Sequence, residues 1–425
     1  MKVSALKTEQ RVETTNDRIL NIQQYGKRND FPQRIMEIVG GSVTGQSCVD
    51  TYSKFIFGRG FAQEDFFRAV VNSRGDTADD VLRAISNDKA MFGGFALHVN
   101  YNALYEIVSV AHVPFEWLRF EKLDDNYKFE HIALHPDWGK RYQKLRRFKS
   151  SDIVWFDLYD PTPAIIASEV EAAGGWDKWK GQILYYSNRG NKCYPLPIFD
   201  AAVTDMSAEE GLSNVMYRNI RKNFLPAGMF IDHNNKPESE DQENQTKKEL
   251  TEFQGDTEAG KMLYINLQDG ETAPEFKPFE AKNTDQSFKQ STQVIPDRIG
   301  ASFRQPPILR AKDVGSNFGA TAMREAYEFY NSQTETDRLD IERVMREVFS
   351  HYVDLSSINP DEDYSILPKV YEATQTLAER LGDRTDKALD VLFDTSKPLD
   401  ARKVVLEEMF GIEPEKVERL TEKLQ

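Results

Sequence analysis

The sequence contains only 2 cysteines among its 425 residues, and Cys48 and Cys193 stand far apart. Two buried, reduced thiols fit this spacing better than one long-range disulfide, as expected of a protein made in a reducing cytosol. No apolar run approaches the roughly 20 residues that a membrane helix requires. The polar start, Met1–Gln10, lacks the apolar core of a secretory signal. The chain is therefore expected to have no membrane partner.

Recognisable motifs for catalysis and cofactor binding are also missing. The sequence has no Gly-x-Ser-x-Gly nucleophile elbow, no Gly-x4-Gly-Lys-Ser/Thr phosphate loop and no dinucleotide-binding fingerprint. His131 and His135 have i,i+4 spacing, but Pro136 follows and no cysteine or carboxylate completes a zinc site. The acidic run Asp361–Asp363 lacks the spacing of a calcium loop and is interpreted as a solvated linker. The sequence predicts no enzyme: no catalytic residues, no metal and no cofactor.

Positive charge is in deficit, because 54 Lys and Arg oppose 69 Asp and Glu, giving a formal net charge of −15. Proteins that wrap nucleic acid are usually basic, so this class is disfavoured. The negative charge is still compatible with a protein wall past which DNA slides. Each phosphate that such a wall neutralised would increase its affinity for DNA and so slow the sliding. The five tryptophans are assigned to core packing rather than to stacking on bases or sugars: Trp117, Trp138, Trp155, Trp176 and Trp179.

Hydrophobic periodicity predicts an α+β domain that extends to about residue 200. Apolar residues recur at helical spacing from Phe31 to Phe57, and Gly58 and Gly60 are expected to end that helix. A further helix begins at Ala78. Alternating segments predict three strands, Phe95–Asn100, Tyr105–Val110 and Ile153–Phe156.

Two predicted helices frame a small hydrophilic insert in the middle of the chain. The first spans Met206–Lys222, and the second starts near Asn283 and contains Pro296, which either kinks it or begins its last turn. The insert is expected to hold a short charged helix and three strands: Glu243–Phe253, Met229–Ile231, Met262–Leu267 and Glu275–Phe279. This layout indicates a stalk with a tip.

A proline pair and a glycine-punctuated loop precede a long helix. Pro306 and Pro307 are expected to end the second stalk helix sharply. The helix predicted from Ala320 to Val348 would be about 45 Å long. Its apolar side holds Met323, Ala326, Tyr327 and Tyr330. Charged residues are expected to crowd the other sides: Arg324, Glu325, Glu328, Asp337, Arg338 and Asp340.

Several stretches, in their order along residues 25–350, resemble the portal proteins of tailed double-stranded DNA bacteriophages. Those similar to the outer domain, called the wing, are Tyr25–Arg34, Phe55–Phe61 and Val113–Arg119. Leu212–Gly228 is similar to the first stem helix running into the domain called the clip. Ile299–Leu309 resembles the end of the second stem helix, and the loop through Gly315–Gly319 resembles the tunnel loop.

The resemblance implies an α+β, portal-like protomer, with the last segment assigned by position alone. The expected parts are an N-terminal arm (1–24), wing (25–203), first stem helix (204–226), small α/β clip (227–282), second stem helix (283–304), tunnel loop (305–320), long wing helix (321–366) and C-terminal helical crown (367–425).

The same resemblance implies a homo-oligomeric ring of about twelve subunits at one capsid vertex, through which double-stranded DNA is packaged and ejected. The terminase large subunit, and later the head–tail adaptor, would dock on the clip. The major capsid protein and scaffold would surround a ring that is made in the host cytoplasm and resides in the virion. Alternatives are another virion connector or minor head protein, or a nucleic-acid enzyme whose acidic residues hold metal ions.

The tunnel loop is expected to hold the DNA-channel residues Arg310, Lys312, Ser316 and Asn317. Pairing of Arg310 and Lys312 with Asp313, or with an acid of a neighbouring subunit, is the alternative. The residues expected to shape this loop are Pro306, Pro307, Gly315 and Gly319.

Two further groups are expected on the stem and the clip. The basic cluster Arg218, Arg221 and Lys222 either faces DNA or the capsid shell, or forms a solvated helix face. The acidic clip residues either dock a basic partner or belong to a merely soluble loop: Asp232, Glu238, Asp241 and Asp256.

Overall fold

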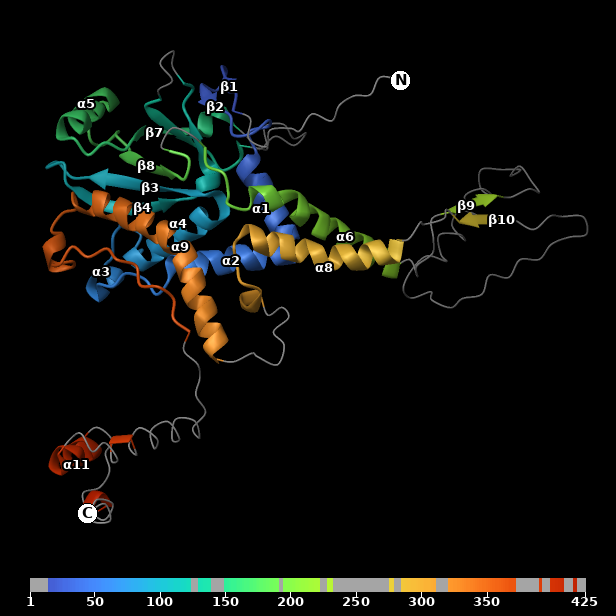
Figure 1. Cartoon of the computed structure of the whole chain (residues 1–425). Coiled ribbons are helices and arrows are strands. Elements are labelled where there is room, and N and C mark those ends of the chain that lie inside the picture. The colour runs from blue at the N-terminus through green and yellow to red at the C-terminus, as the bar shows by residue number, and fades with distance from the viewer. Residues whose placement is uncertain are drawn as a thin grey trace, which may run out of the picture. The chain divides into compact units, whose positions relative to one another are not determined.

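The computed structural model describes residues 14–123, 129–138, 149–190, 194–221, 228–231, 275–278, 284–310, 320–371, 390–391, 398–408 and 416–418. The chain divides into two compact units, Met1–Lys369 and Val370–Gln425. The first unit is a mixed α+β structure, as the sequence predicts, and contains a six-stranded sheet (Figure 1).

The sheet has the strand order β4-β3-β8-β7-β6-β5. Every neighbouring pair is antiparallel except β7 and β8, which run parallel. The three predicted strands are confirmed as β3, β4 and β7. The bounds are β3 (Gly94–Tyr101), β4 (Ile107–Val113), β5 (Leu118–Phe120), β6 (His131–Leu134), β7 (Val154–Leu158) and β8 (Gln182–Ser187).

The helix expected to run unbroken from Phe31 to Phe57 is instead two helices, α1 (Phe31–Gly41) and α2 (Val43–Phe57). Ser42 adopts an extended conformation between them, and its hydroxyl accepts a hydrogen bond from the backbone N–H of Gly45. This N-cap satisfies one of the free donors at the start of α2. Periodicity alone missed the break because apolar spacing continues on both sides of it.

Helix α2 is the centre of the helical layer, since it contacts α1, α4 (Ala78–Phe92), α6 (Val203–Arg221), α8 (Thr284–Ser302) and α9 (Ala320–Phe349). Helix α4 packs on β3 and thereby joins this layer to the sheet. The remaining elements in the described part of the first unit are β1 (Asn16–Asp17), β2 (Ile22–Gln23), α3 (Glu64–Arg68), η1 (Phe115–Trp117), η3 (Ser150–Asp152), α5 (Pro163–Ala173), η4 (Asp200–Ala202), β9 (Gly228–Ile231), β10 (Glu275–Pro278), η5 (Pro307–Arg310) and η6 (Leu355–Ser357).

Aromatic side chains fill much of the core. The ring of Tyr194 stacks between those of Tyr25 and Phe120, with centroid separations of 4.0 and 4.4 Å. Cys48 is buried with a free thiol, as expected, whereas Cys193 lies outside the described residues. The tryptophan prediction holds only in part: Trp138 is buried, but Trp117 and Trp176 are each 38% exposed.

The second unit, Val370–Gln425, is described mainly by helix α11 (Leu399–Glu408). Leu406 is 1% exposed, so α11 has one buried side. Its identity as a crown stays a prediction.

Candidate functional site: a helix pair, a proline turn and the long helix α9

Helices α6 and α8 form a pair, and they lie side by side in Figure 1. The strands next to them in the chain, β9 and β10, pair antiparallel, from Gly228 with Pro278 to Ile231 with Glu275. An ion pair joins the two helices, with Arg298 Nη1 3.3 Å from Asp205 Oδ1. The chain therefore leaves the α+β body along one helix, turns back through a strand pair and returns along the other.

The outer half of α6 is hardly buried within one chain. Every residue from Ser213 to Tyr217 is exposed. These include Val215, Met216 and Tyr217, which are 40%, 50% and 60% exposed. Val294 of α8 is 45% exposed. Adjacent exposed apolar side chains are typical of surfaces that associate with another protein.

The inner end of α6 is held on the body by Glu209. Its carboxylate accepts hydrogen bonds from the Ser42 hydroxyl, from the Thr44 hydroxyl (2.6 Å) and from the Thr44 backbone N–H (3.2 Å). A carboxylate at the N-terminus of α2 also interacts favourably with the helix dipole. Glu209 therefore fixes the base of the helix pair to α2.

The turn after α8 differs from the expectation for the proline pair. Helix α8 ends at Ser302, so Pro306 and Pro307 do not end it. The change of direction comes at Arg304, whose φ of 54° is left-handed. Pro307 begins the short helix η5, where its fixed φ and missing N–H are tolerated. Pro296 lies well inside α8 and does not begin its last turn.

Arg310, at the end of η5, folds back on α8. Its Nη1 donates a hydrogen bond to the Pro296 carbonyl (2.8 Å) and lies 3.6 Å from Asp297 Oδ1. The side chain is 10% exposed. The acid beside Arg310 is therefore Asp297, while Asp313, the partner considered from the sequence, lies outside the described residues.

Helix α9 spans Ala320–Phe349, as the sequence predicts. Ala326 and Tyr330 are buried on its apolar side, and Arg324, Glu325 and Glu328 are exposed. The other three charged residues, Asp337, Arg338 and Asp340, do not lie on the exposed outer faces where they were expected. Arg338 is buried, with hydrogen bonds to the Phe55 carbonyl, the Asn331 carbonyl and the Thr334 hydroxyl.

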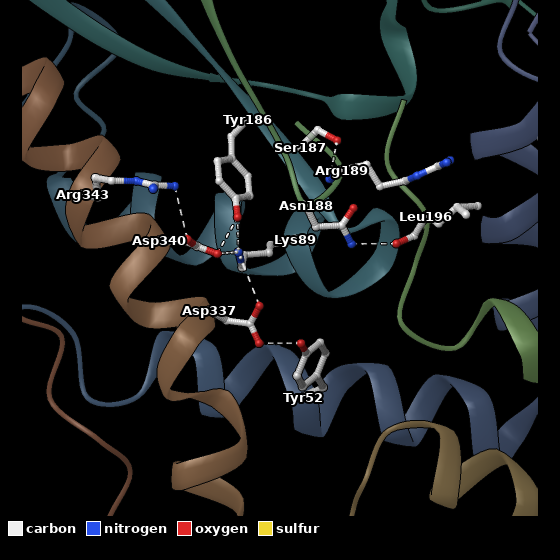
Figure 2. A network of polar contacts seen from close by, with 10 residues as sticks. All are labelled: Tyr52, Lys89, Tyr186, Ser187, Asn188, Arg189, Leu196, Asp337, Asp340 and Arg343. Carbon is white, nitrogen blue, oxygen red and sulfur yellow. Dashed lines mark hydrogen bonds and ion pairs between the residues drawn. The ribbon is translucent and has the colours of Figure 1, made fainter. Parts of the chain in front are cut away.

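Asp337 and Asp340 face the body, where they meet Lys89 of α4 (Figure 2). The Lys89 side chain is only 3% exposed, and its Nζ lies 3.4 Å from Asp337 Oδ1 and 3.1 Å from Asp340 Oδ2. The hydroxyl of Tyr52 donates to Asp337 (2.6 Å), and that of Tyr186 donates to Asp340. This network, here called the Lys89 network, joins α9 to α2, α4 and β8.

The tyrosines of this network stay protonated donors. Burial, reinforced by Asp337, raises the pKa of Tyr52 far above its usual value. Burial and the hydrogen bond to Asp340 likewise raise the pKa of Tyr186. Sequence reasoning missed Lys89, although a signal existed. Lys89 lies on the same face of α4 as the apolar residues Val81, Leu82 and Ile85. A lysine in such a position is buried and therefore needs an acidic partner.

A groove of about 800 Å³ lies between α5 and the strands β6 and β7. Its lining includes Ile165 and the acidic residues Glu130, Asp157, Asp160 and Glu169. Burial, followed by the nearby Asp157 and Asp160, raises the pKa of Glu169 to about 7, although a hydrogen bond from Gln182 opposes this. Among the residues that the structure describes, no cluster of histidine, cysteine and carboxylate side chains could hold a metal ion.

The remaining predicted site residues are only partly located. Arg218 and Arg221 lie on the last turn of α6. The rest fall outside the described residues: Lys222, Asp232, Glu238, Asp241, Asp256, Lys312, Gly315, Ser316, Asn317 and Gly319. Within the described part of the chain, no helix has the length and apolarity to cross a membrane.

No protein-family model and no curated protein matches the sequence. Solved structures do match. The neck of an empty gene transfer agent particle matches with 13% identity over 90% of this chain and 94% of that chain, at a TM-score of 0.44. An HK97 family phage portal protein from Corynebacterium diphtheriae matches with 10% identity over 75% of this chain and 92% of that chain, at a TM-score of 0.41. The similar structures thus include a phage portal protein, the class that the sequence resembles.

Proposed function

We propose that the chain is a subunit of a phage portal ring, the connector through which double-stranded DNA enters and leaves a capsid. The observation that carries the proposal is the α6–α8 pair, which leaves the body, ends in the β9–β10 pair and exposes Val215, Met216 and Tyr217. In a single chain, these exposed apolar side chains on α6 contribute little to stability, because they stay in contact with water. A ring of copies would bury them between neighbours.

In this proposal, α6 and α8 are the stem and β9–β10 belongs to the clip. The terminase large subunit, and later the head–tail adaptor, would dock on the acidic clip segment between Asp232 and Asp256. The major capsid protein and scaffold would contact the outside of the ring. ATP hydrolysis would belong to the terminase, because this sequence has no phosphate-binding loop.

The tunnel loop, expected at residues 305–320, would face the channel, with Lys312, Ser316 and Asn317 as donors to phosphates. A few donors per subunit, repeated around the ring, would steady the duplex without reading its sequence. The net charge of −15 would keep the affinity for DNA low, so that the duplex can slide. Arg310 is not counted among these donors, because its side chain is docked on α8.

Mass photometry of the purified chain at nanomolar concentration, followed by negative-stain imaging, tests this function. The expected particles are rings with a central hole and a mass near twelve times 48.8 kDa. If only monomers appear, the measurement is repeated with the scaffold protein of the same phage. Continued absence of rings with scaffold would contradict the proposal, and metal-dependent nuclease activity of a monomer would favour an enzyme instead.

A further inference from the structure

The segment from the end of α8 to the end of η5 carries two largely buried polar side chains, and only one of them is anchored to α8. Gln305 is 4% exposed, and neither atom of its side-chain amide has a hydrogen-bond partner among the described residues. Arg310, by contrast, donates from Nη1 to the carbonyl of Pro296 and faces the carboxylate of Asp297. Arg310 is therefore the polar side chain that attaches η5 to α8.

The guanidinium of Arg310 lies directly on Gly300. If Gly300 carried a methyl group, that carbon would overlap Cζ, Nη1 and Nε of Arg310. Glycine destabilises a helix interior relative to alanine, so its presence here calls for a reason. The reason is space: without a side chain at Gly300, the planar guanidinium can approach the helix closely enough to reach the carbonyl one turn earlier.

We propose that Arg310 is a positioning residue that docks the C-terminal end of η5 on α8, and that Gly300 is required because it makes room for the guanidinium. Pro296, Asp297 and Gly300 together form this Arg310 docking site. The consequence for a channel rests on the proposed portal function: the end of η5, which precedes the expected channel-facing segment in the chain, is held in place by α8. Arg310 then acts through protein contacts and does not bind phosphate.

Trypsin tests the docking directly, because it cleaves after Arg310 only when the guanidinium leaves α8 and enters the protease. The Gly300→Ala variant is expected to be cleaved after Arg310 about tenfold faster than the wild type. Cleavage after Arg189, in an exposed turn, should keep its rate and serves as the internal reference. Equal cleavage rates after Arg310 in both proteins would overturn the proposal.

The matched control is Gly211→Ala on α6, where an added methyl group meets no atom within 4 Å. This variant should keep or slightly raise the Tm, because alanine favours the helix. Gly300→Ala should instead lower the Tm by about 2–4 °C. In an Arg310→Ala background that loss should disappear, since no guanidinium remains to be displaced. If Gly300→Ala lowers the Tm equally in both backgrounds, Arg310 does not explain the glycine.

The same samples separate this inference from the proposed function. Cleavage and Tm are measured on the free chain, whereas rings are counted by mass photometry of the wild type. Absence of rings with normal protection of Arg310 would count against the portal function alone. Rings together with an unprotected Arg310 in the wild-type chain would count against the docking alone.

Discussion

Lys89 on α4 lies 3.1 Å from Asp340 and 3.4 Å from Asp337, so that one buried ammonium group joins two carboxylates of the long helix α9. Its Nζ also lies 4.4 Å from the ring centre of Tyr186, on β8. The contact therefore ties three elements that are far apart in the sequence: α4, β8 and α9. In the proposed portal, it would hold the long helix while the loop before it meets DNA.

Replacing Lys89 with methionine should destabilise the first unit by about 3 kcal/mol, because two carboxylates would face the interior without their cation. The value lies at the low end for buried pairs, since Asp337 and Asp340 are 23% and 24% exposed. Urea titration, with tryptophan fluorescence as the signal of unfolding, measures this change in the free energy of unfolding. The control Lys54→Met removes an exposed pair with Asp50 and should cost less than about 0.5 kcal/mol. Equal losses in the two variants would contradict this role.

Glu169 should make stability depend on pH. Its pKa is raised to about 7 in the folded chain, mainly by burial, so the folded state binds a proton more tightly than the unfolded state. This contribution to stability is fully present below the unfolded pKa, near 4.5, and is lost as the pH rises through 7. Glu169→Gln should therefore raise the Tm at pH 8 relative to the wild type and have less effect at pH 4.5. Glu171→Gln, an exposed change on the same helix, should leave the pH profile unaltered.

Met216→Glu tests the association surface on α6. Met216 is 50% exposed in one chain, and a carboxylate buried there between neighbours would cost about 2–4 kcal/mol per interface. Mass photometry should show rings dissociating to smaller species at concentrations where wild-type rings persist. Leu104→Glu, at a loop residue that is 74% exposed, should leave the ring mass unchanged. Intact rings from both variants would place Met216 outside the interface.

Glu209→Ala should loosen the base of the helix pair. The change removes three hydrogen bonds from Ser42 and Thr44, together with a favourable charge at the N-terminus of α2. The expected loss is about 1–2 kcal/mol in the free energy of unfolding, measured by urea titration. Glu210→Ala, at the exposed neighbouring position, should cost clearly less. A loss no greater than in that control would show that α2 does not depend on Glu209.

The sequence by itself determined the order of most helices and strands along the chain. Proline and glycine restrict the backbone locally, and apolar spacing follows the helix and strand periods, so α9, the helices α6 and α8, and the strands β3, β4 and β7 were all predictable. The break at Ser42 was missed because the apolar pattern of α1 and α2 continues across it.

Only the tertiary structure decided which charged residues face inward. Periodicity showed that α9 is amphipathic. However, the groups that meet Asp337 and Asp340 in the interior come from α2, α4 and β8, and α2 supplies the Phe55 carbonyl that accepts from Arg338. A charged side chain is stable in the interior only where the fold brings compensating groups close to it. No local sequence pattern shows which distant residues will come that close. For the same reason, the sequence alone did not predict the contact of Arg310 with Gly300, which depends on η5 packing against α8.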